Sequence, residues 1–141
     1  MNHPKILKNL VRYVLIIIAS NIVPKAESCT VINPEYTVEI LNYIPNGSGF
    51  LSFHCASGDS ELGNHTLDYG QNYEWSFCNK PFGRTLFFCR FYWLAKQQAF
   101  EVYNANWCKD CTGELCFWLV KVDGFYFKGY IGDLIKKYNW P

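Results

Sequence analysis

Three cysteines close together, Cys108, Cys111 and Cys116, are the residues whose type and spacing first suggest chemistry. Cys108 and Cys111 have the C-x-x-C spacing of thiol oxidoreductases, and with Cys116 they would offer three zinc ligands. A redox site needs its first cysteine near a helix N-terminus, and zinc thiolates compete poorly with disulfides in an oxidising compartment. Since the segment lies between two predicted strands, we interpret these cysteines as structural.

The other polar candidates point to no reaction. His54 stands next to Cys55, but neighbouring residues of a strand face opposite ways, so the two cannot form a nucleophile–base pair. Asp59, Glu61 and Asp68 offer oxygen ligands for calcium, yet their spacing does not match an EF-hand, and we favour a solvated loop. With no Gly-rich phosphate loop, G-x-S-x-G motif or pair of catalytic carboxylates, the sequence predicts no enzyme, no metal site and no cofactor.

Alternating apolar residues indicate the elements that must position these side chains. In a strand, residues two apart share a face, so Phe87, Cys89 and Phe91 point the same way. This alternation, with turn residues between the segments, predicts strands at 37–44, 50–57, 72–78, 85–93, 100–104, 116–122 and 125–128. Asp123-Gly124 is typical of a two-residue hairpin. We therefore predict an all-β fold, an antiparallel β-sandwich of about seven to eight strands.

The tail at 130–141 fits two interpretations. Ile131, Leu134 and Ile135 have the spacing of a helical turn, whereas the large rings of Tyr138 and Trp140 favour packing against the sheet. We prefer the second interpretation, because no segment of ten residues has a convincing helical pattern.

The N-terminal segment has the pattern of a secretory signal peptide. Three basic residues precede the apolar run Tyr13–Ala19, which falls short of the about 20 apolar residues of a membrane-spanning helix. Small residues favour cleavage after Ser28, with Ala26 as the alternative, and a buried core helix is the competing interpretation of the run. We predict a signal peptide at 1–28, a secreted β-sandwich domain at 29–141 and no stable membrane insertion.

Charge narrows the range of partners. The 141-residue chain has a formal net charge of +1, which becomes −2 when Lys5, Lys8, Arg12, Lys25 and Glu27 leave with the signal peptide. The mature chain has no cluster of basic residues that would bind phosphate groups, so we predict no nucleic-acid partner.

Seven cysteines in a secreted chain predict a disulfide framework with one cysteine left over. Cys55, Cys89 and Cys116 fall on the apolar faces of their predicted strands, and Cys108 precedes the last of these strands. We prefer the pairs Cys55–Cys116 and Cys89–Cys108, although four cysteines allow three pairings and the sequence does not choose among them. A third bridge among Cys29, Cys78 and Cys111 would leave one free thiol or a disulfide-linked dimer, so both a monomer and a dimer stay open.

Two predicted loops are candidates for recognition. Gly58–Gly70 is long and polar, and Ala105–Leu115 contains Trp107, which either contacts a partner or packs under its own loop. Two N-x-S/T sequons predict glycosylation at Asn46 and Asn64, both expected in loops.

Taken together, the motifs of this chain resemble those of the plant self-incompatibility protein family, the stigmatic S-protein homologues. The motifs occur in order over nearly all of the mature chain: Phe53-His54-Cys55-Ala56-Ser57, Glu61-Leu62-Gly63, His65, Leu67, Gly70, Tyr73-Glu74-Trp75-Ser76-Phe77, Gly83-Arg84-Thr85-Leu86-Phe87-Phe88-Cys89-Arg90-Phe91, Phe100-Glu101-Val102-Tyr103, Cys108, Cys116-Phe117-Trp118 and Asp123-Gly124-Phe125-Tyr126. The resemblance implies a secreted β-sandwich whose four family cysteines map onto Cys55, Cys89, Cys108 and Cys116. It also implies a non-enzymatic extracellular signal; the best-understood members are made in the stigma and recognised by a pollen membrane receptor.

The chain departs from the family pattern at three places. Ser60 replaces an acidic residue, Tyr43-Ile44 stands where Asn-Leu is usual, and Cys29, Cys78 and Cys111 are additional. Our hypothesis is a ligand for a cell-surface protein receptor. The alternative is a secreted defence or toxin-like protein that acts on cells or membranes, although we find no amphipathic cationic segment to support it.

Overall fold

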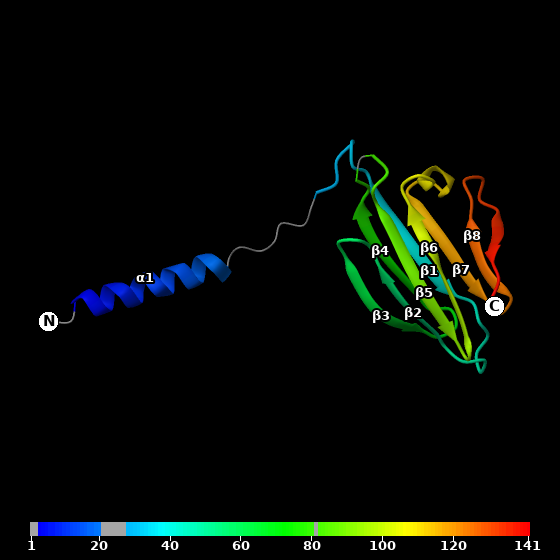
Figure 1. Cartoon of the computed structure of the whole chain (residues 1–141), viewed down its shortest axis with the longest axis horizontal. Coiled ribbons are helices and arrows are strands. Elements are labelled where there is room, and N and C mark those ends of the chain that lie inside the picture. Colours follow the sequence, from blue (N-terminus) through cyan, green and yellow to red (C-terminus); the bar gives the residue numbers. More distant parts are fainter. Residues whose placement is uncertain (1–2, 21–27, 81) are drawn as a thin grey trace.

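Two β-sheets packed face to face make up the body of the protein, as the computed structural model shows (Figure 1). The structure describes residues 3–20, 28–80 and 82–141. One sheet has the order β4-β1-β7-β8-β9, with bounds β4 Asn72–Cys78, β1 Glu35–Asn42, β7 Leu115–Lys121, β8 Gly124–Lys128 and β9 Leu134–Tyr138. The other has the order β3-β2-β5-β6, with bounds β3 Glu61–Leu67, β2 Leu51–Ala56, β5 Leu86–Trp93 and β6 Lys96–Asn104. A helix α1, His3–Ser20, precedes the strands, and a short 3₁₀ turn η1, Cys108–Asp110, lies before β7.

The core is built by the alternation seen in the sequence. In β5, Phe87, Cys89, Phe91 and Trp93 are buried, whereas the residues between them are exposed. Phe91 is fully buried, and its ring lies 5.0 Å from that of Phe125 in the opposite sheet, measured between centroids. Burial of one such Phe contributes on the order of 2–3 kcal/mol, so aromatic contacts between the sheets hold the sandwich together.

The all-β sandwich is therefore confirmed, with differences in its strands. The described residues form nine strands rather than seven to eight, and β1 pairs parallel with β7 while the other pairs are antiparallel. Much of the predicted loop 58–70 is strand β3, in which Gly63 adopts a positive φ of +76° beside the bulge at Cys55/Ala56. The sequence of β3 did not indicate a strand, because Gly63 and the polar residues around it interrupt the apolar alternation.

The tail interpretation is also confirmed. Residues Leu134–Tyr138 form β9, and the Tyr138 ring stacks on Phe100 with centroids 4.2 Å apart. Trp140 is buried between Phe125 and Trp93, and its Nε1–H donates a hydrogen bond of 2.9 Å to the carbonyl of Lys121. The end of the chain thus closes one side of the core.

The disulfides correct the preferred pairing. Cys55 bonds to Cys89, its direct partner in the antiparallel β2–β5 register, with the two Cα atoms 4.1 Å apart. Both side chains do face the core, as predicted. The expected bridges Cys55–Cys116 and Cys89–Cys108 were wrong because the face of a strand says nothing about which strand lies beside it.

The other cysteines are placed differently as well. Cys29 bonds to Cys78, and Cys111 bonds to Cys116 over a separation of 5 residues. Cys108 is the free thiol among the seven cysteines, all of which the structure describes, and it is half-buried. The three additional cysteines are therefore all paired within the chain, which removes them as links between two subunits. The only thiol left for a disulfide-linked dimer, one of the two states left open by the sequence, is that of Cys108.

The signal peptide at 1–28 stays a prediction, but the expectation that no segment of ten residues is helical is wrong, because α1 has 18 residues. Residues 4–15 of α1 carry exposed apolar side chains, among them Leu7 and Leu15. Among the described residues, no helix has the length and apolar character needed to cross a membrane. Of the two expected cleavage positions, Ala26 lies outside the described residues and Ser28 is the first residue of the described segment that leads to β1.

Candidate functional site

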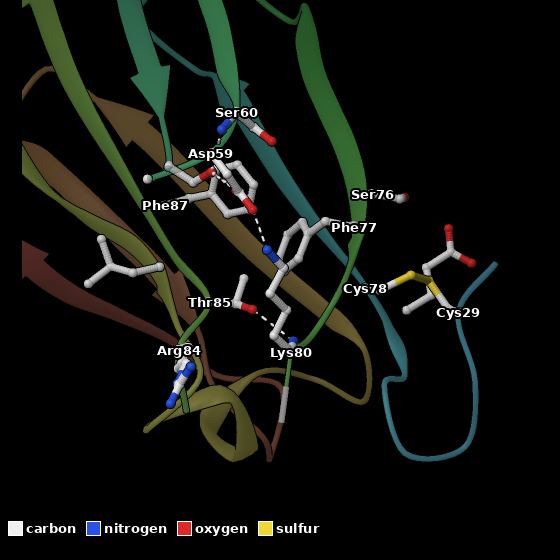
Figure 2. A pocket seen from close by; sticks show the side chains of 14 residues that line it. Cys29, Asp59, Ser60, Ser76, Phe77, Cys78, Lys80, Arg84, Thr85 and Phe87 are labelled. Carbon is white, nitrogen blue, oxygen red and sulfur yellow. Dashed lines mark hydrogen bonds and ion pairs between the residues drawn. A yellow bond between two sulfur atoms is a disulfide. The ribbon is translucent and has the colours of Figure 1, made fainter. Parts of the chain in front are cut away.

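A groove of about 610 Å³ opens at one end of the sandwich (Figure 2). Three segments far apart in the sequence meet there: the N-terminal segment at Cys29, the β2–β3 turn at 57–60 and the β4–β5 connection at 80–87. They meet because β2 and β4 end at this side of the molecule and β3 and β5 begin there. The site is thus built on loops held by four strands, where binding residues commonly lie.

The β2–β3 turn is fixed by its own hydrogen bonds. The backbone N–H of Ser57 donates to the carbonyl of Ser60 at 2.8 Å, and the Ser60 N–H donates to Ser57 Oγ at 3.1 Å. Ser57 Oγ–H in turn donates to Asp59 Oδ1 at 3.0 Å. This network holds the Asp59 carboxylate at the rim of the groove.

An ion pair crosses the groove from this turn. The Lys80 ammonium reaches Asp59 Oδ2, and the Lys80 backbone N–H donates to Thr85 Oγ1 at 2.8 Å, as Figure 2 shows. Hydrogen bonds from Lys80 and then Ser57 hold the pKa of Asp59 below its usual value. Both side chains are largely exposed, so the pair contributes little to stability and instead places one charge of each sign on the rim.

The β4–β5 connection adds an unusual aromatic residue. The Phe82 side chain is 93% exposed, and its backbone has a φ of +70°, a left-handed conformation that L-residues other than Gly seldom adopt. Gly83 follows with a φ of +67°. Arg84 then lines the groove, and among the described residues its guanidinium makes no hydrogen bond or ion pair with a side chain. The connection therefore carries an exposed aromatic residue, Phe82, and two positions later a cation that lines the groove, Arg84.

The floor of the groove is apolar. Phe77 and Phe87 come from the two sheets, and their ring centroids lie 4.6 Å apart. The Cys29–Cys78 disulfide forms a wall beside them and ties the N-terminal segment to the end of β4 (Figure 2). This arrangement of an apolar floor with a charged rim is suited to holding a side chain of a partner.

Several polar groups of the groove are engaged with one another. No histidine is among its described lining residues, its two cysteines are bonded to each other, and of its two acids, Glu35 and Asp59, the second pairs with Lys80. The groove therefore offers a partner apolar contact and charge.

The three acidic residues considered as calcium ligands, for which a solvated loop was favoured, do not lie together. Asp59 pairs with Lys80, and Glu61 pairs with His54. Asp68 lies beyond the other end of β3. Among residues 3–20, 28–80 and 82–141, no group of three or more His, Cys, Asp or Glu side chains has the geometry to hold a metal ion.

The two expected recognition loops lie at different places. Gly58, Asp59 and Ser60 line the groove, but the rest of that segment is mainly β3. Trp107 lies elsewhere, with its ring 5.8 Å from that of Phe127.

Both sequon asparagines are exposed. Asn46 lies between β1 and β2, and Asn64 lies within β3 rather than in a loop. The structure leaves both asparagines accessible, and glycosylation at these positions stays a prediction.

Sequence reasoning missed the basic and aromatic half of the groove. The residues between the predicted strands at 72–78 and 85–93 were treated only as turn residues, and Arg84 was noted only as part of a family motif. A Lys and an Arg flanking an aromatic residue in a turn were the available signal. Their convergence with Asp59 depends on the pairing of β2 with β5, as in Ala56 with Phe88, which no local pattern reveals.

Comparison with known proteins decides the family. The model of the plant self-incompatibility protein S1 family matches residues 37–140. This range includes β1 from Thr37 onward and the whole of the other eight strands. The chain belongs to this family. It is 37% identical over 92 residues to S-protein homolog 2 of Arabidopsis thaliana and 38% identical over 98 residues to S-protein homolog 24 of the same plant. It is 32% identical over 96 residues to self-incompatibility protein S1 of Papaver rhoeas. This match covers 66% of this chain and 68% of that protein.

A solved structure supports the fold of this family member. It is an SPH, or self-incompatibility protein homologue, described as one of "a widespread family of small, highly stable, secreted proteins from plants". The match has a TM-score of 0.63 at 20% identity and covers 79% of this chain and 98% of that one. The matches to S-protein homologs 2 and 24 cover 62% and 64% of this chain but only 56% and 61% of those proteins. Family membership therefore fixes the fold of this chain, and its partners and activity are a matter for proposal.

Proposed function

We propose that this S-protein homologue is a secreted, non-enzymatic signalling protein that binds a cell-surface protein receptor. The observation that carries the proposal is the groove, which has an apolar floor and a rim with one positive and one negative side chain. Arg84 also lines the groove, and the exposed Phe82 lies two residues before it in the chain. Aromatic and Arg side chains dominate the energetics of protein interfaces. Secretion is supported by three intrachain disulfides, which persist in oxidising compartments, and by the signal-like N-terminus.

The receptor-facing surface in this proposal is the β4–β5 connection together with the groove rim. Phe82 is exposed and held in a left-handed conformation, so its ring is available to enter a pocket on a partner without a change of the backbone. Arg84 has no side-chain partner among the described residues, and its fork of donors suits a carboxylate of the partner. The Asp59–Lys80 pair would set the orientation of the partner through charge.

The test is binding of the fluorescently labelled, oxidised protein to pollen and to leaf protoplasts of the source plant. We expect saturable binding that is lost when the cells are treated with protease. Phe82→Ala and Arg84→Ala should each weaken binding by about 10-fold or more, as truncation of an interface hot spot does.

Matched controls come from the same chain. Phe50 is 57% exposed at the opposite end of β2, and Arg90 is exposed on the outer face of β5, so Phe50→Ala and Arg90→Ala should bind like the wild type. Equal binding by the groove variants and these controls would refute the proposed surface. Equal binding to protein-free lipid vesicles, with leakage of their contents, would instead support the membrane-acting alternative.

A further inference from the structure

A second hollow of about 400 Å³ lies at the edge of the sandwich where β6 faces β9, and none of its lining residues belongs to the groove. Its walls are mainly aromatic and come from both sheets and from the loop before β7. The rings that matter to the argument are Phe100, Trp107, Trp118, Phe127 and Tyr138. We call this hollow the aromatic cleft.

The rings that line the aromatic cleft form one continuous cluster. Trp107 and Phe127 meet at 83° with centroids 5.8 Å apart, and Trp118 lies 4.8 Å from Phe127. Phe100 lies 4.9 Å from Trp118, and Tyr138 stacks on Phe100 at 4.2 Å. Rings from several elements that surround one space are the arrangement by which proteins hold organic ammonium groups, since the ring faces carry negative charge density.

Two carboxylates give the aromatic cleft a negative balance. Glu101 and Asp110 line it together with one cation, Lys137. Glu101 Oε2 accepts a hydrogen bond of 3.0 Å from Asn104 Nδ2, whereas Asp110 has no side-chain partner within the described part of the chain. A second positive charge would therefore be attracted, and its attraction would be strengthened by the apolar surroundings.

The chain already places a cation against one wall. Lys137 Nζ lies 6.0 Å from the centroid of the Phe127 ring. Its side chain extends from β9, an edge strand whose five residues are all exposed, so the ammonium is free to move to solvent. Lys137 thus occupies the position that a ligand cation would take.

We propose that the aromatic cleft binds a small, diffusible organic ammonium ion and that Lys137 acts as a built-in competitor. The ring faces and the Glu101 and Asp110 carboxylates hold the ligand, and the ligand displaces the Lys137 ammonium from Phe127. The aromatic cleft shares no lining residue with the groove, so the result of this test does not depend on whether the groove binds a receptor.

The test is an NMR titration of the full oxidised protein with choline and with spermidine, followed through the Trp107 indole N–H and the amides of β9. We expect saturable shifts at both places. Lys137→Met, which keeps the stem and removes the charge, should tighten binding by about 2- to 5-fold, the factor that corresponds to one exposed cation–π contact. Asp110→Asn, Glu101→Gln and Trp107→Leu should each weaken binding.

Controls separate charge from shape. Lys96 Nζ lies 5.4 Å from the Trp93 ring away from the aromatic cleft, so Lys96→Met should leave binding unchanged. The neutral choline analogue 3,3-dimethylbutanol has the same shape without the charge and should not bind. Weaker binding in Lys137→Met, equal binding of the neutral analogue, or no saturable shift with either amine would each overturn the proposal. The amide spectrum of each variant shows whether it is folded.

Discussion

At the scale of single residues, the most unusual group is the hydroxyl of Tyr103. The residue is fully buried, and among the described atoms its hydroxyl has no well-formed hydrogen bond. Burial raises the pKa of Tyr103, and the neighbouring Cys108 thiol raises it further. Burial and the same thiol raise the pKa of Tyr36 to about 12, and the two tyrosine rings lie 5.5 Å apart. A pair of tyrosines thus stays neutral well above the pH at which free tyrosines ionise.

The first prediction concerns Tyr103→Phe. Removing a buried hydroxyl that lacks a partner should leave the free energy of unfolding unchanged or raise it by about 1 kcal/mol at pH 7. Both folded pKa values lie above the unfolded value of about 10, so the contribution of these two tyrosines to stability is constant below about pH 10 and falls above it. Because Tyr103 no longer ionises in the variant, its stability should fall less steeply over that range.

The measurement is urea unfolding from pH 7 to 11, made in a Cys108→Ala background, which prevents thiol exchange at high pH and leaves burial as the main cause of the raised Tyr103 pKa. Tyr92→Phe is the matched control, because Tyr92 is 42% exposed on the outer face of β5. This control should follow the background protein at every pH. A loss of more than about 1 kcal/mol at pH 7 in Tyr103→Phe would show that the hydroxyl makes a hydrogen bond that stabilises the fold.

At the scale of elements, one buried amide connects the two sheets. Asn42 at the end of β1 is fully buried, and its Nδ2 donates to the carbonyl of Leu67 in β3 at 2.9 Å. Its Oδ1 accepts a hydrogen bond from the backbone N–H of Ile44 at 3.0 Å. The side chain therefore satisfies two buried backbone groups, one in β3 of the other sheet and one in the β1–β2 connection, where the chain leaves the first sheet.

The second prediction is that Asn42→Ala lowers the free energy of unfolding by about 2–4 kcal/mol. Two buried backbone groups lose their partners, and each costs about 1–3 kcal/mol when left unsatisfied. Chemical denaturation at pH 7 gives the value. Asn72→Ala serves as the control, since Asn72 also bonds across strands, to Glu39, but at the surface, and should lose under 1 kcal/mol. Equal losses in the two variants would show that burial of the amide is not what matters.

These elements also show what a sequence reveals and what it does not. Alternation of apolar and polar residues is a local pattern, and it correctly predicted that Phe87, Cys89 and Phe91 point into the core. It also predicted the strand at 72–78, whose bounds are those of β4. The Cys55–Cys89 pair and the groove depend on register between distant strands, and alternation is the same for every register that keeps the apolar face inward. β3 was missed because its core-facing side carries Gly63 and His65 in place of large aliphatic residues.

At the scale of the whole molecule, the three disulfides restrain very different lengths of chain. Cys29–Cys78 spans 49 residues, Cys55–Cys89 spans 34, and Cys111–Cys116 spans only 5. If a bridge acts mainly by restricting the unfolded chain, the first two each stabilise the fold by roughly 4 kcal/mol and the third by roughly 2 kcal/mol. The long bridges differ in place: Cys55–Cys89 lies in the core, whereas Cys29–Cys78 borders the groove.

The last prediction follows from this difference. Paired Ala substitutions at Cys29 and Cys78 should lower stability by roughly 4 kcal/mol and also release the N-terminal segment from the end of β4, so hydrogen exchange should rise around Glu35 and the groove. The same change at Cys111 and Cys116 should cost roughly 2 kcal/mol and leave exchange at the groove as in the wild type. Denaturation of non-reduced protein with amide exchange read by mass spectrometry measures both effects, after peptide mapping has verified the three pairs. If both variants lost the same stability and neither changed exchange at the groove, loop length and position would not explain how the bridges affect stability and hydrogen exchange. The contrast therefore tests whether the Cys29–Cys78 bridge holds the proposed binding surface in place.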